Sequence, residues 1–74
     1  MKDKSRMSRE VLAGLTNQVV YGTIRSVEEA GYNTNTENGH MALVLVLGNA
    51  FIVLALTVGL DPSSVLNKIG GLYD

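Results

Sequence analysis

Tyr21 and Arg25 have side-chain types and a spacing that suit the binding of an anion. Residues four apart lie on one face of a helix, one turn from each other. An aromatic ring beside a guanidinium can stack on a base while the guanidinium pairs with a phosphate. We therefore expect this pair to contribute to a site for a small anionic, nucleotide-like ligand. The alternative interpretation is an ordinary surface contact between the two side chains.

Other polar side chains can join such a site. Asn33, Asn35 and His40 belong to the most polar stretch, residues 32–40, and offer hydrogen bonds from a predicted loop. Arg6 and Arg9 lie in or beside a short basic N-terminal arm and can add positive charge from a neighbouring subunit. The structural alternative is a solvated arm and a loop that bonds its own backbone. The expected ligand-binding set is Tyr21, Arg25, Asn33, Asn35, His40, Arg6 and Arg9.

The residue content argues against catalysis and against a bound metal. The chain has no Cys and one His, so no Cys/His cluster has metal-ligand spacing. Glu28 and Glu29 are adjacent, and adjacent helical side chains point in different directions. No nucleophile has a base beside it. We predict a protein that is not an enzyme and that requires no cofactor and no metal.

Residues 41–60, MALVLVLGNAFIVLALTVGL, are the most apolar stretch, and no charged residue lies between Glu37 and Asp61. About 20 apolar residues can cross a bilayer core of roughly 30 Å, so one interpretation is a transmembrane helix. The flanks are acidic or small, without the Trp, Lys or Arg anchors typical of membrane helices. A second interpretation is a β-hairpin of residues 43–47 and 51–56. A third is a helix buried by partners, which we favour because a short chain cannot cover both faces of an apolar hairpin.

Capping residues predict where the first two helices begin and end. Ser8 is a suitable N-cap, apolar residues follow at helical spacings, and Gly31 suits the position after the last turn. Thr34 and Glu37 have the spacing of a capping box, which allows the second helix to start as early as Asn35.

A break and a new helix follow the apolar run. Gly59 can take the left-handed conformation that ends a helix, and Asp61 can cap a helix whose first residue is Pro62. The predicted organisation is a flexible basic arm over 1–7 and a single helical domain over 8–74. Its helices are expected over about 8–30, 36–58 and 62–69.

A chain of 74 residues without Cys buries little core on its own. If half of the central helix faced water, about six large side chains would together lose on the order of 10 kcal/mol of burial energy. We therefore predict an all-α fold, a helical hairpin of two long helices plus a short C-terminal helix, assembled as a homo-oligomeric bundle. The expected oligomer interface comprises Leu15, Val19, Gly48, Asn49, Phe51, Ala55 and Gly59.

The segment from Asn49 to Ile69, a helix, a Gly59-Leu60-Asp61 break and a short helix, resembles the last helices of the all-α nucleoside triphosphate pyrophosphohydrolases. In that family, paired acidic residues on facing helices bind magnesium and position water for attack on a phosphoanhydride. Here residues 44–47, Val-Leu-Val-Leu, stand in the central helix where those carboxylates are needed. The resemblance covers under a third of the chain and implies the helical fold, not the activity.

Two functional hypotheses follow. The first is a cytoplasmic homo-oligomer that acts by binding a protein partner or a small anionic ligand between subunits. Its net charge of −1 argues against nucleic-acid binding. Such a chain would suit a viral protein that inhibits a host factor or sequesters a signal. The alternative is a single-pass membrane protein with a transmembrane helix over 41–60, such as a small pore-forming or lysis protein.

Overall fold

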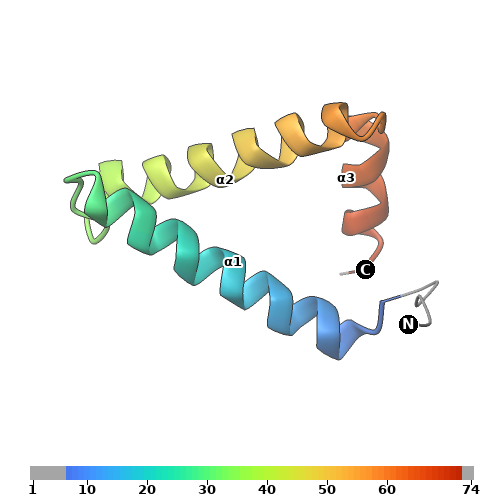
Figure 1. The fold of residues 1–74 in the computed structure, drawn as a ribbon, viewed down its shortest axis with the longest axis horizontal. Helices are drawn as coiled ribbons and strands as arrows, with labels where there is room; N and C mark the ends of the chain where they lie inside the picture. Colours follow the sequence, from blue (N-terminus) through green and yellow to red (C-terminus); the bar gives the residue numbers. More distant parts are fainter. Residues whose placement is uncertain (1–6, 73–74) are drawn as a thin grey trace. The chain divides into compact units, whose positions relative to one another are not determined.

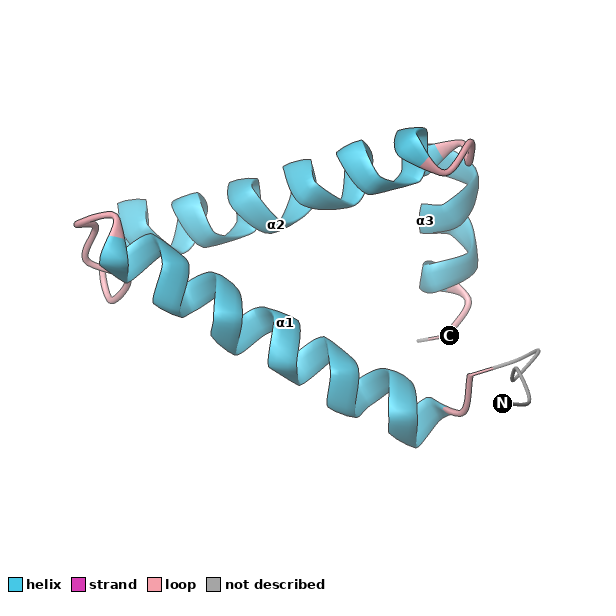
Figure 2. Ribbon diagram, in the orientation of Figure 1, coloured by secondary structure: helices cyan, strands magenta, loops and turns pink. Residues whose placement is uncertain are grey.

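The computed structural model describes residues 7–72, which form three α-helices (Figure 1). α1 spans Arg9–Glu29, α2 spans Glu37–Thr57 and α3 spans Pro62–Gly70. Residues 7–72 contain no strand (Figure 2), so the all-α prediction is confirmed. The β-hairpin interpretation of residues 43–56 is wrong, because one continuous helix satisfies the backbone of the apolar run without a partner strand.

Backbone contacts divide the chain into two compact units, one ending at Leu43 and the other beginning at Val44. The first unit holds α1, the α1–α2 connection and the start of α2. The second holds the rest of α2, the turn after it and α3. The predicted hairpin of two long helices and its assembly concern arrangements beyond either unit, and they stay predictions.

α1 begins and ends at the residues that its capping pattern predicts. The Ser8 hydroxyl accepts a hydrogen bond from the backbone N–H of Val11 at 3.2 Å. At the other end Gly31 has φ +100°, and its N–H donates to the Glu28 carbonyl at 2.9 Å. The N–H of Tyr32 donates to the Val27 carbonyl at 3.3 Å. This pair of bonds is the Schellman motif, which satisfies carbonyls of the last turn.

The α1–α2 connection is held by side-chain hydrogen bonds that differ from the predicted capping box. Thr36, not Thr34, caps α2: its hydroxyl accepts from the Gly39 N–H at 3.0 Å. Thr34 instead donates to the Glu28 carboxylate at 3.0 Å and is buried. The capping box of Thr34 with Glu37 is therefore wrong, because Thr36 has the same chemistry and stands directly before Glu37.

Gly39 lets the connection lie directly against the first turn of α2. A Cβ added there would lie 2.8 Å from the Cα of Thr34 and closer still to the carbonyl oxygen of Asn33. Gly39 is buried by this contact. The backbone approach therefore depends on the missing side chain at this position.

In the second unit, a Schellman motif ends α2 and a carboxylate cap starts α3. Gly59 has φ +80°, and the Leu60 N–H donates to the Ala55 carbonyl at 2.8 Å. The Asp61 carboxylate accepts from the backbone N–H of Ser64 at 3.2 Å and from its hydroxyl at 2.9 Å. Pro62 occupies the first turn of α3, so the predicted break is confirmed.

Candidate functional site

Tyr21 and Arg25 both lie on the solvent-exposed surface of α1. Tyr21 is 68% exposed, so its ring is free to stack on a planar ligand. Four helical residues rise about 6 Å, which brings the guanidinium within reach of a ligand on that ring. The pair provides an aromatic face and a cation on an exposed helix surface.

The predicted loop residues are largely used to shape the connection. The Asn33 side-chain oxygen accepts from the Asn35 N–H at 2.9 Å, and the Asn33 carbonyl accepts from the Thr36 hydroxyl at 3.1 Å. Asn35 is exposed, and His40 is exposed in the first turns of α2. Asn33 therefore acts first as a turn residue, which leaves Asn35 and His40 as the freer hydrogen-bonding groups.

The predicted cations are spread along the chain. Arg9 is the first residue of α1, and sixteen residues of helix place it about 24 Å from Arg25 along the helix axis. Arg6 lies outside the described residues. The Arg9 and Arg25 guanidinium groups of one chain therefore cannot contact the same phosphate. In residues 7–72 no group of three His, Asp or Glu side chains lies close enough to hold a metal ion.

The predicted interface residues fall into exposed and covered groups. Leu15 and Val19 are exposed on α1, and Asn49 is exposed on α2, where Gly48 has open space around it. Ala55, by contrast, is 5% exposed. The remaining two are half-buried Phe51 and the exposed turn residue Gly59.

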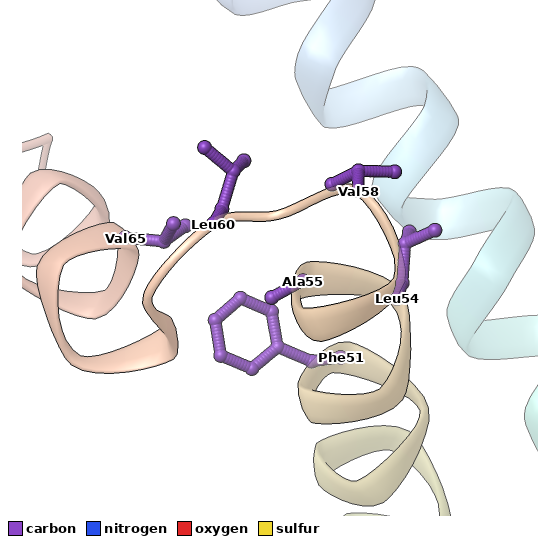
Figure 3. Close-up of a pocket in the computed structure, with 6 residues that line it drawn as sticks. All are labelled: Phe51, Leu54, Ala55, Val58, Leu60 and Val65. Atoms are coloured by element: carbon purple, nitrogen blue, oxygen red, sulfur yellow. The ribbon is translucent and has the colours of Figure 1, made fainter.

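Phe51 and Ala55 line an apolar pocket within the second unit (Figure 3). It has a volume of about 160 Å³ and is lined by Phe51, Leu54, Ala55, Val58, Leu60 and Val65. Figure 3 shows the Phe51 ring and Ala55 on α2 beside the turn, with Val65 on α3 opposite. No lining side chain offers a hydrogen bond, so the pocket suits an apolar group and not an anion.

Large apolar side chains are exposed on all three helices. Among residues 7–72 the buried apolar residues are Val27, 6% exposed, and Ala55. The outer positions of α2, which sequence reasoning did not single out, include Leu45, Ile52 and Leu56. These three residues lie four positions before, three after and seven after Asn49, a helical spacing that could have identified them from the sequence.

α2 is long and apolar enough, by length and composition, to cross a membrane. It has 21 residues, its most apolar window of 18 residues has a mean hydropathy of 2.2, and 11% of that window is buried. The expected span over 41–60 needs correction, because the helix ends at Thr57 and Gly59 turns the backbone. The apolar helical part is residues 41–57, about 25 Å long, against a bilayer core of roughly 30 Å.

Comparison of the chain with known proteins gives no match to a family model, to a curated protein or to a solved structure.

Proposed function

We propose that this protein is a non-catalytic, cytoplasmic homo-oligomer of α-helices that acts by binding. Its partner is a protein, such as a host factor, or a small anionic ligand held between subunits. The observation that carries the proposal is the exposure of apolar side chains on every helix, with Val27 and Ala55 as the buried apolar residues among 7–72. Association of copies is the route by which a short chain without Cys gains the missing core.

The distribution of the exposed residues favours association over membrane insertion. A bilayer would cover α2, but exposed apolar residues also include Leu12 and Leu15 on α1 and Leu66 on α3. Residues 58–60 leave the helix, and irregular backbone in contact with lipid is costly because its polar groups lack partners. Contacts between copies can cover all three helices.

The ligand-binding version rests on the exposed pair of Tyr21 and Arg25. Because Arg9 lies about 24 Å away along α1, the second cation in this proposal is Arg9 of another subunit. A phosphate-bearing ligand between subunits would then contact an aromatic face and two guanidinium groups. This arrangement suits the sequestration of a nucleotide-like signal.

A single-pass membrane protein is the second candidate, favoured by the length and hydropathy of α2. The two candidates separate in one experiment. The protein is expressed without detergent, membranes are removed by ultracentrifugation, and the soluble species is weighed by light scattering. We expect a discrete soluble multimer. Recovery in membranes alone, with release by detergent, would contradict the proposal and direct attention to permeability assays.

The binding role is tested on the soluble multimer by calorimetric titration with nucleotides, including cyclic dinucleotides. Arg25→Ala should weaken binding at least about tenfold, as expected for loss of a charge-assisted contact. Lys68→Ala is the matched control, because it removes one positive charge from α3 instead of α1. Equal effects of the two variants would remove Arg25 from the site.

A further inference from the structure

Four side chains form a stripe along the exposed surface of α2: Leu45, Asn49, Ile52 and Leu56. They follow one another at intervals of four, three and four residues, and at 100° per residue they lie within about 60° on the helical wheel. This alternation is the spacing of a coiled-coil seam, in which such residues pack against a partner helix. We call these four residues the outer seam.

The outer seam lies away from the side chains that α2 uses within its own unit. Phe51 and Ala55 point toward the turn and α3 (Figure 3), whereas Leu45 is 62% and Leu56 is 64% exposed. Ile52 is 45% exposed. The seam is therefore open along its length, while Phe51 and Ala55 are partly or fully covered.

Asn49 is the polar residue of the outer seam. The other polar side chain of the apolar stretch is Thr57, whose hydroxyl donates to the Val53 carbonyl at 2.7 Å and so is satisfied within the helix. The Asn49 amide can both donate and accept, so two copies of it can pair with each other. An Asn at one seam position of a coiled coil fixes register and subunit number at some cost in stability.

The register favours a parallel pair. In a parallel pair centred on Asn49, each seam residue meets its own copy, including Leu45 against Leu45. In an antiparallel pair, Leu45 would meet Val53, which lies about 70° away from the seam centre on the helical wheel. Among arrangements that pair Asn49 with its own copy, only the parallel one places every member of the seam against another member.

We infer that the outer seam of α2 binds the outer seam of a second copy, in parallel, with the two Asn49 side chains paired at the centre. This inference rests on the proposed homo-oligomer and names its contact surface. The occupant is a second copy because the seam is complementary to itself: its three exposed apolar side chains can pack against their own copies, and the Asn49 amide can pair with its own copy. A seam whose single polar group can pair with itself also needs no other partner.

Single cysteines test the seam directly, because the natural chain has none. Leu45→Cys places a thiol in the seam. Val44→Cys is the matched control, since Val44 is 67% exposed but lies about 110° from the seam centre. A disulfide requires Cα atoms within about 7 Å, so Leu45→Cys should cross-link at least tenfold faster under mild oxidation. Equal rates, or faster cross-linking of Val44→Cys, would overturn the seam.

Asn49→Leu supplies a second readout in the soluble protein. We expect a change or a mixture in the mass measured by light scattering, together with a higher thermal midpoint, because the polar constraint is gone. An unchanged mass and midpoint would contradict the Asn49 pair. A wild type that is monomeric or found only in membranes defeats the proposed function itself. A soluble multimer without selective cross-linking at residue 45 defeats the seam alone.

Discussion

The connection between α1 and α2 is held by individual side-chain hydrogen bonds and by one close backbone approach. Thr34 ties the connection to Glu28 of α1, and Thr36 caps α2 by accepting from Gly39. Gly39 itself leaves room for the backbone of Asn33. These contacts account for the burial of Thr34, a polar residue that is 6% exposed.

Gly39→Ala should destabilise the protein by about 1–3 kcal/mol, because the new methyl group would overlap the connecting backbone. Gly14→Ala is the control, since nothing lies within 4 Å of a Cβ there and Ala is the better helix former by roughly 1 kcal/mol. Urea unfolding at one fixed protein concentration measures both. Destabilisation by Gly14→Ala, or stabilisation by Gly39→Ala, would contradict the close approach of the connecting backbone to Gly39.

At the scale of elements, the helix ends are where sequence and structure correspond most closely. Gly31 and Gly59 both have positive φ and both carry the two hydrogen bonds of the Schellman motif. Asp61 and Pro62 restart the chain as α3 directly after the second motif. The direction in which α3 leaves the turn therefore depends on one left-handed residue, Gly59.

Gly59→Ala should cost about 1–2 kcal/mol, because a Cβ disfavours the left-handed conformation, whereas Gly59→Asn should cost less. A Cβ at residue 59 would have no atom within 4 Å beyond its chain neighbours, so steric overlap does not contribute. Thermal unfolding followed by circular dichroism compares the two variants at equal concentration. Equal losses for Ala and Asn would argue against a conformational origin.

Helix ends could be read from sequence because each depends on a few neighbouring residues. Ser8, Gly31, Gly59 and Asp61 act within about one turn of their own position. The cap of α2 was misassigned because Thr34 and Thr36 offer the same chemistry, and only the connection's path distinguishes them. The candidate site was harder to predict, because the proposed meeting of Arg9 and Arg25 from different copies would depend on contacts between chains and not on neighbouring residues.

For the whole molecule, the proposed homo-oligomer couples folding to association, because contacts between copies would cover the exposed apolar side chains. The thermal midpoint should then rise with protein concentration, since dilution favours the separated and unfolded chains. Scans between about 1 and 100 μM would show the trend, with circular dichroism as the readout. A midpoint that stays constant over this range would indicate a monomer that is stable alone.

The exposed length of α2 also has a consequence for the lifetime of the protein in a cell. If the chain assembles as proposed, a newly made copy that has not yet met another presents an apolar helix to chaperones and proteases, which remove unassembled protein continuously. Survival would then depend on synthesis fast enough for chains to meet before they are degraded. Abundance would switch on above a threshold rate of expression instead of following that rate in proportion.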